Sequence, residues 1–143
     1  MTAPYDPLSD GWKPMDQGAA LPGGLGLPLA RQIDGAWHYG LQTRADHANP
    51  NGVLHGGVLM SFADHALSML AWEAGDRAPC TTIQLNTHFL DAIKPGEFIE
   101  CRGEVTRRTR SLIFLRGVVS VRHHHAWRDV GAVDGIWRSF HPR

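Results

Sequence analysis

The sequence predicts an α+β fold in which one long central helix is wrapped by a curved antiparallel β-sheet of about five to six strands. Three observations predict it. Residues 58–72 carry apolar side chains at helical spacing, whereas the segments before and after them alternate apolar and polar side chains with a period of two. No strand–helix–strand repeat occurs, so the chain lacks the crossover helices that a parallel sheet needs.

Composition limits the class of protein. The 143 residues suffice for one domain with its own core, and 14 basic residues balance 14 acidic ones. A nucleic-acid-binding protein would show a basic excess, so no nucleic-acid partner is expected. No apolar run reaches the length of a membrane span, and the first twenty residues lack the pattern of a secretory signal. We therefore expect a cytoplasmic protein, whose Cys80 and Cys101 are reduced and buried.

The first elements follow from turn residues. Residues 1–24 contain four prolines and four glycines and are predicted to form an irregular N-terminal arm, which Trp12 and Met15 are placed to hold against the body. The single domain is predicted over residues 25–143. Its first strand covers residues 25–33, and the Asp34–Gly35 pair is a strong hairpin signal that leads into a second strand over residues 36–44.

The loop and helix that follow organise the chain. Residues 49–57 are rich in turn formers, and the helix after them begins with Gly56 and Gly57. A helix start has backbone N–H groups without an intrahelical partner, and glycines leave those donors uncovered. Together with the helix dipole they favour negative charge, including the oxyanion of a reaction intermediate.

The same helix carries a narrow polar stripe. At 100° per residue, most of residues 58–72 form a broad apolar arc, and Ser61, Asp64, His65 and Ser68 fall together on the remaining arc. A solvated helix face usually carries Lys, Glu and Arg, whereas this stripe has small hydroxyls, one carboxylate and one imidazole. We therefore interpret the stripe as the lining of a site, in preference to an ordinary solvated face.

After Gly75 the chain is predicted to form only strands, over residues 81–90, 98–105, 112–121 and 129–140. Residues 94–97 and 123–125 are predicted turns, and a basic cluster at residues 107–110 connects the second and third of these strands. One helix against one open sheet leaves sheet edges unpaired, which favours dimerisation by strand addition.

The motif residues resemble a known family. The pattern Asn49-x5-His55-Gly56-Gly57-x6-Asp64, a strand at residues 82–86 and a Lys-Pro-Gly-Glu turn at residues 94–97 are similar to those of the hotdog-fold acyl-CoA thioesterases of the PaaI type. The resemblance covers roughly residues 24–140 and extends to the connection at residues 109–112. It implies a helix wrapped by a long antiparallel sheet, dimers that pair into homotetramers, and hydrolysis of acyl-CoA without a metal or an organic cofactor.

The resemblance also implies roles for individual residues. Asp64 matches the catalytic acid, and Gly56 matches the backbone donor to the thioester carbonyl. Asn49 matches the residue that polarises the carbonyl or holds the water, and His55 matches the motif histidine. Thr82 stands where some members have a serine that orients the attacking water. The carbonyl chemistry itself needs only a carboxylate and about two hydrogen-bond donors, because a thioester is a good electrophile.

Substrate-binding residues and the sharing of sites are predicted separately. Five residues are expected to contact the substrate: Gly57, Ser61, Ser68, Arg108 and Arg110. The arginines suit the phosphates of coenzyme A, although a solvated basic loop is an equally good interpretation. Gly56 and Asp64 lie eight residues apart, about 12 Å along a helix, so they are too distant to serve one carbonyl. Two antiparallel helices in a homodimer would bring Gly56 of one chain beside Asp64 of the other.

Two other functions stay open. Asp46 and Asn49 partly match the Asp-x-Asn-Pro-x-His pattern of hotdog enoyl-CoA hydratases, but an extra residue separates them and the histidine is missing from its place. A non-catalytic acyl-CoA-binding module is the other alternative. The three histidines at residues 123–125 are interpreted as a solvated turn and not as a metal site, because consecutive side chains on a strand point to alternate sides.

Overall fold

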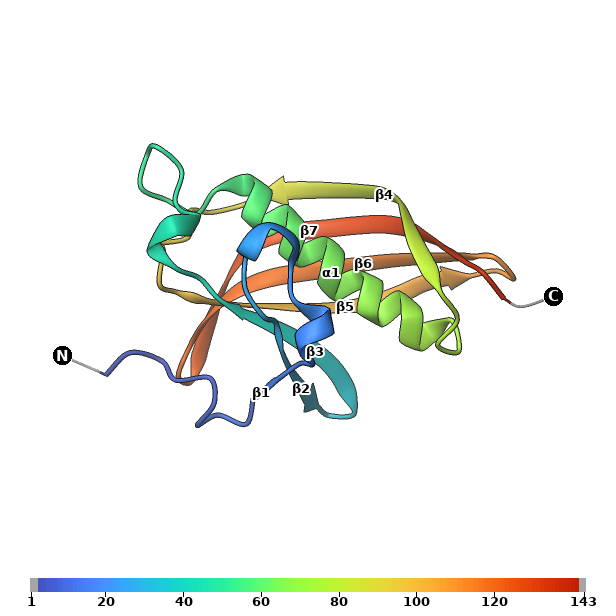
Figure 1. The fold of residues 1–143 in the computed structure, drawn as a ribbon, viewed down its shortest axis with the longest axis horizontal. Coiled ribbons are helices and arrows are strands. Elements are labelled where there is room, and N and C mark those ends of the chain that lie inside the picture. The colour runs from blue at the N-terminus through green and yellow to red at the C-terminus, as the bar shows by residue number, and fades with distance from the viewer. Residues whose placement is uncertain (1–2, 142–143) are drawn as a thin grey trace.

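The computed structural model describes residues 3–141 and confirms one long helix packed against an antiparallel sheet (Figure 1). The strands are β1 (Lys13–Pro14), β2 (Leu29–Ile33), β3 (Ala36–Gln42), β4 (Cys80–Phe89), β5 (Phe98–Arg108), β6 (Leu112–His123) and β7 (Ala126–Ser139). The helices are α1 (Gly56–Ala74) and the short 3₁₀ turns η1 (Gln17–Ala19), η2 (Pro22–Gly24) and η3 (Ala45–His47).

The sheet has seven strands in the order β1-β2-β3-β5-β6-β7-β4, and every adjacent pair is antiparallel. The predicted count of five to six strands was therefore too low. The additional strand is β1, which pairs with β2 through Lys13 and Pro14. A two-residue strand that contains a proline has no alternation to detect, and a proline is tolerated there because β1 lies at the edge of the sheet.

Helix α1 crosses one face of the sheet and forms the centre of the core (Figure 1). It begins with the two predicted glycines, and it ends where the Gly75 N–H binds the Ala71 carbonyl, with the next two residues in the left-handed conformation. Its sheet-facing side is fully apolar and consists of Val58, Leu59, Phe62, Ala63, Ala66, Leu67 and Ala71. The helical periodicity therefore predicted the buried face, and the polar stripe flanks it, with Asp64 and Ser68 in contact with Thr82 of β4 and Trp137 of β7.

Strand β4 departs from the predicted alternation. Its pairing with β7 shifts between Thr82 and Gln84, so Ile83 is an extra residue that has no partner of its own. Such a bulge reverses the side on which the following side chains lie. Thr82, before the bulge, consequently faces α1, and Leu85 and Thr87, after the bulge, are half-buried as well. Strict alternation from residue 81 had placed Thr82 on the other face of the strand from Leu85 and Thr87.

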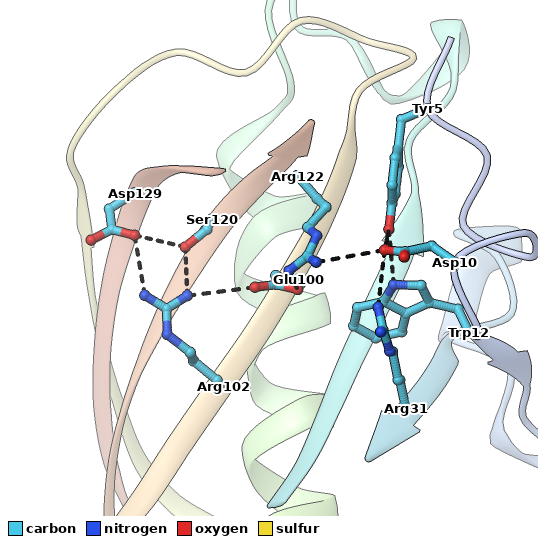
Figure 2. A network of polar contacts seen from close by, with 9 residues as sticks. All are labelled: Tyr5, Asp10, Trp12, Arg31, Glu100, Arg102, Ser120, Arg122 and Asp129. Atoms are coloured by element: carbon cyan, nitrogen blue, oxygen red, sulfur yellow. Dashed lines mark hydrogen bonds and ion pairs between the residues drawn. The ribbon is translucent and has the colours of Figure 1, made fainter. Parts of the chain in front are cut away.

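Tyr5, Asp10 and Trp12 of the N-terminal segment lie against the face of the sheet opposite α1 (Figure 2), whereas Leu21 of the same segment is buried in the core that contains α1. Trp12 is buried and its ring packs edge-on against Phe98, with 5.1 Å between centroids. The Tyr5 hydroxyl donates to Asp10, which also pairs with Arg31. Residues 1 and 2 of the predicted arm lie outside the described residues, as do the last two residues of the predicted domain. Within residues 3–141, α1 and the 3₁₀ turns lack the length and apolarity that a bilayer-crossing helix needs.

Candidate active site

The start of α1 leaves one backbone donor free. His55 precedes the helix, and its Nδ1 accepts a hydrogen bond of 2.9 Å from the Gly57 N–H. The Val58 N–H donates to the His55 carbonyl, also at 2.9 Å. Among residues 3–141 nothing accepts from the Gly56 N–H. The local cap therefore satisfies Gly57 and leaves Gly56 as the donor that the helix start can offer to a substrate.

The cap also defines the state of His55. Because Nδ1 is the acceptor, the proton of the neutral ring is on Nε2. The ring is exposed, and its backbone N–H is bound by the His47 carbonyl at 2.8 Å. The arrangement gives His55 a structural role at the helix start.

The loop before α1 is held by Asn49. Its side-chain oxygen accepts from the N–H of Asn51 at 2.9 Å and from that of Val53 at 3.3 Å. Its backbone N–H donates to the Val53 carbonyl at 2.8 Å. This leaves the amide NH₂ of Asn49, which donates to no acceptor in residues 3–141, as the part of the side chain able to bind a carbonyl oxygen.

Asn49 and Gly56 line one cavity of about 400 Å³, together with Leu59, Phe89 and Leu90. The ring of Phe89 lies over Gly56, and a Cβ placed on Gly56 would be 3.1 Å from that ring. Gly56 is therefore the residue type that allows the aromatic wall and the exposed backbone to approach each other. The predicted carbonyl-binding residues are thus brought together, in a cavity that does not include Asp64.

Asp64 is held by hydroxyl groups. Thr82 Oγ1 donates to Asp64 Oδ1 at 2.6 Å, and the Ser68 hydroxyl lies 3.4 Å from Thr82 Oγ1. The indole N–H of Trp137 donates to Ser68 Oγ at 2.8 Å. The structure thus brings Asp64, Thr82 and Ser68 together and adds Trp137, which the sequence did not indicate. An aromatic residue on a predicted strand is most often core, and only the register of β4 on β7 reveals its partners.

The other predicted substrate-binding residues on α1 are engaged within the chain. The Ser61 hydroxyl donates to the Gly57 carbonyl at 2.8 Å, four residues earlier on the helix. Ser68 lines a second cavity of about 410 Å³ with His65, Met69 and Trp72. Nε2 of His65 is buried without a partner in residues 3–141. Within the polar stripe, Ser61 is therefore bonded to the backbone of α1, whereas Ser68 belongs to the hydroxyl groups that hold Asp64.

The predicted phosphate-binding arginines lie far from Gly56. Arg108 ends β5 and pairs with Asp76, just past the C-terminal end of α1, at 2.6 Å. Its hydrogen bond lowers the pKa of the Asp76 carboxyl. Arg110 is exposed in the following turn. Arg108 thus lies beside the end of α1 opposite the Asn49–Gly56 loop, and the turn between β5 and β6 that contains Arg110 follows it directly. One chain therefore does not bring them to the carbonyl-binding cavity.

The run of histidines forms a turn, as predicted, since β6 ends at His123 and β7 begins at Ala126. His124 Nε2 lies 3.0 Å from the Ala3 carbonyl oxygen, and His123 lies 3.6 Å from Glu97. No cluster of three metal-binding side chains occurs in the part of the chain that the structure describes.

The fold and the motif at the helix start define a hotdog-fold protein, and comparison with known proteins assigns the family. The model of the thioesterase superfamily matches residues 51–125, so the chain belongs to that superfamily and is a thioester hydrolase. The match includes the helix start, Asp64 and Thr82. No curated protein matches the sequence.

Solved structures agree with this fold. A phenylacetic acid degradation-related protein from Ralstonia eutropha is 25% identical, with a TM-score of 0.71 over 92% of this chain and 96% of the other. A hypothetical thioesterase from Streptococcus pneumoniae, solved with coenzyme A, is 18% identical, with a TM-score of 0.68 over 80% and 86%. A hexameric hotdog-fold thioesterase of Campylobacter jejuni is 19% identical, with a TM-score of 0.66 over 71% and 80%.

Proposed function

We propose that this protein hydrolyses acyl-CoA thioesters to a carboxylic acid and free coenzyme A, at sites shared between the two subunits of a homodimer. In each site, the Gly56 N–H and the Asn49 amide of one chain polarise the thioester carbonyl. Asp64 of the other chain either activates the attacking water or attacks the carbonyl carbon itself, in which case water then hydrolyses the acyl–aspartate anhydride to the carboxylic acid. The thiolate of coenzyme A then leaves without a strong general acid.

The observation that carries this proposal is the separation of the two halves of the chemistry. Gly56, with its free N–H, lines the same cavity as Asn49. Ser68, which belongs to the hydroxyl groups that hold Asp64, lines the other cavity. Eight residues of helix, about 12 Å, separate Gly56 from Asp64. Reacting atoms must approach within about 3 Å, so a single chain offers either the electrophile-binding half or the acid half of one site.

The edge of the sheet offers a surface for the second copy. β4 is an edge strand, and its Ile83 and Phe89 are 55% and 56% exposed, with Leu90 directly after them at 57%. Large apolar side chains on a strand with one unpaired edge are what strand addition between subunits would cover. This edge borders both halves of the proposed site, since it supplies Thr82 to one and Phe89 to the other.

Pairing of dimers into a homotetramer is the further assembly that we propose, and light scattering measures it directly. The Campylobacter jejuni protein is named as a hexamer, so a protein of this fold can assemble beyond the dimer. We keep a cytoplasmic location as part of the proposal, because both cysteines are free.

Binding of the coenzyme A phosphates by Arg108 and Arg110 is part of the same proposal. Asp64 lies ten residues before the end of α1, about 15 Å along its axis, and Arg108 lies beside that end. An extended substrate whose thioester is at Asp64 would have to span this distance. Substitution of either arginine should then raise KM for acyl-CoA and leave kcat nearly unchanged.

The experiment is a panel of acyl-CoA esters assayed for free thiol. Hydrolysis releases thiol, hydration of an enoyl ester removes its absorbance without thiol, and a binding module does neither. The structure favours hydrolysis over hydration, because Asp46 is exposed and paired with Arg44 at 3.0 Å, outside the cavity of Asn49. Absence of thiol release across short, long and aromatic acyl groups would refute the proposal.

Shared sites are tested by complementation. An Asn49→Ala chain and an Asp64→Ala chain should each be inactive as homodimers. After mixing and subunit exchange, one of the two sites in each mixed dimer has both residues, so each mixed dimer should recover up to about half of the wild-type rate. Exchange confirmed by mass spectrometry, with no recovery of activity, would contradict the sharing of sites.

A further inference from the structure

The support of Asp64 is a directional chain of hydrogen bonds. The indole N–H of Trp137 is only a donor, so the Ser68 oxygen that it contacts at 2.8 Å must accept. The single hydrogen of Ser68 is then available to Thr82 Oγ1, 3.4 Å away. Thr82 in turn donates its hydrogen to Asp64 Oδ1 at 2.6 Å. Each hydroxyl accepts on one side and donates on the other, and the chain ends at one carboxylate oxygen.

We propose that Trp137 is a positioning residue for Asp64, and that its chain through Ser68 and Thr82 holds Oδ1 and leaves Oδ2 as the reacting oxygen. This inference rests on the proposed function, because it assigns the oxygen of Asp64 that activates water or attacks the thioester carbonyl. Trp137 itself does not touch the substrate, since its side chain has no exposed surface.

Three features of the fold orient the Trp137 indole. Trp137 on β7 is the direct cross-strand partner of Thr82 on β4, so both side chains face α1 at the level of Ser68. The bulge after Thr82 maintains this orientation while the rest of β4 changes phase. Gly135 lies between the ring and β4: a Cβ there would be 2.7 Å from the indole and closer still to the Gln84 carbonyl oxygen, so a larger residue would displace the indole or the β4 backbone. Pairing, bulge and glycine therefore all place the N–H at Ser68.

The chain of hydrogen bonds also restricts which partners the Thr82 hydroxyl can bind. Its one hydroxyl hydrogen is used by Asp64, so Thr82 has only a lone pair to offer to a water molecule. A donor role toward the attacking water, as the resemblance implies for a serine at this place, would require the bond to Asp64 to break. We assign Thr82 to orientation of the carboxylate, and the water to Oδ2.

Two variants interrupt the chain at different points. Trp137→Phe removes the N–H and retains most of the ring, and Ser68→Ala removes the hydroxyl and retains the indole. In either variant Thr82 is free to rotate, and Oδ1 of Asp64 loses its fixed donor. We expect kcat for the best acyl-CoA ester to fall about 10-fold in each, with KM changed less than about two-fold, because ground-state binding is untouched.

The variants should also act as a unit. The double variant Trp137→Phe with Ser68→Ala should be no slower than the slower single variant, since both changes break the same chain. The matched control is Trp127→Phe, on the same strand but 55% exposed and stacked on Arg122, which should retain wild-type kcat. Circular dichroism and light scattering verify fold and assembly.

Three outcomes would overturn the inference: wild-type kcat in Ser68→Ala, additive losses in the double variant, or an effect confined to KM. If Trp137→Phe does not fold, Ser68→Ala alone decides, because Ser68 is only half-buried and the change removes a single oxygen atom while the indole stays in place. Failure of the wild-type protein to release thiol would refute the proposed function. Thiol release by the wild type with unchanged variants would refute this inference alone.

Discussion

Two carboxylates, the half-buried Asp64 and the buried Glu100, lie on opposite faces of the sheet and are held in different ways. Glu100 on β5 is 2% exposed and pairs with Arg102 at 3.6 Å and with Arg122 at 3.4 Å (Figure 2). Asp64 on α1 is bound by the Thr82 hydroxyl, and it forms no ion pair with any residue in positions 3–141. Glu100 is therefore surrounded by charge, whereas neutral donors hold Asp64.

The difference indicates which carboxylate can react. Ion pairs engage both oxygens of Glu100, and the Tyr5–Asp10 contact extends that network to the N-terminal segment. Burial and the hydrogen bond to Asp10 raise the pKa of Tyr5 to about 12, so its hydroxyl remains a donor. We therefore assign this network of ion pairs around Glu100 a structural role. At Asp64 one oxygen receives no hydrogen bond from residues 3–141, as a general base or nucleophile requires.

The largest expected effect separates the two carboxylates by activity. Asp64→Asn should lower kcat for acyl-CoA hydrolysis by about three orders of magnitude, because the amide neither accepts a proton nor attacks a carbonyl. Glu100→Gln should retain kcat within about two-fold. Thiol release by the purified variants measures both. Comparable losses in the two variants would remove the functional distinction between the faces.

The next effect concerns the helix start. Gly56→Ala places a Cβ 3.1 Å from the Phe89 ring, which must move or displace the Gly56 N–H. We expect kcat to fall about 100-fold, as for loss of one oxyanion donor. Gly18→Ala, with no atom within 4 Å of its Cβ, is the control and should behave as wild type. Full activity of Gly56→Ala would exclude this N–H from catalysis.

Arg122→Met tests the structural role of the outer network. It leaves Glu100 buried with Arg102 as its remaining partner, and we expect the free energy of unfolding to fall by about 3 kcal/mol, with kcat unchanged. Burial raises the pKa of Glu100, and Arg122 is the main opposing influence, so the variant should raise that pKa further. The loss should therefore be largest at neutral pH and shrink as acid protonates Glu100. Urea unfolding at pH 7 and pH 4.5 measures it, and a pH-independent loss would contradict the account.

The smallest effect is the pH dependence of stability. Burial lowers the pKa of His38, His47 and His65 below the usual 6.5. These rings are neutral in the folded chain and bind protons on unfolding, so their contribution is fully present above pH 6.5 and is lost as the pH falls through their folded pKa. The urea midpoint of unfolding should thus decrease as the pH is lowered from 7.5 to 5.5, and it should decrease less steeply in His38→Gln. An unchanged slope in His38→Gln would show that this ring does not contribute.

The sequence by itself determined the features that depend on local periodicity and local chemistry. The apolar arc of residues 58–72, the two glycines at the helix start and the polar stripe with Asp64 are properties of one continuous segment, and the structure shows each of them. The antiparallel arrangement followed from the absence of crossover helices. The resemblance at residues 49–64 indicated the superfamily that the match over residues 51–125 confirms.

The tertiary structure alone decided how those residues are supported. The bulge after Thr82, the pairing of Thr82 with Trp137 and the edge strand at Lys13–Pro14 depend on contacts between segments far apart in the chain. A shift of one residue in register turns a side chain to the other face of a sheet, and periodicity does not specify where such a shift falls. For this reason Asp64 was visible in the sequence, whereas the indole that positions it was not.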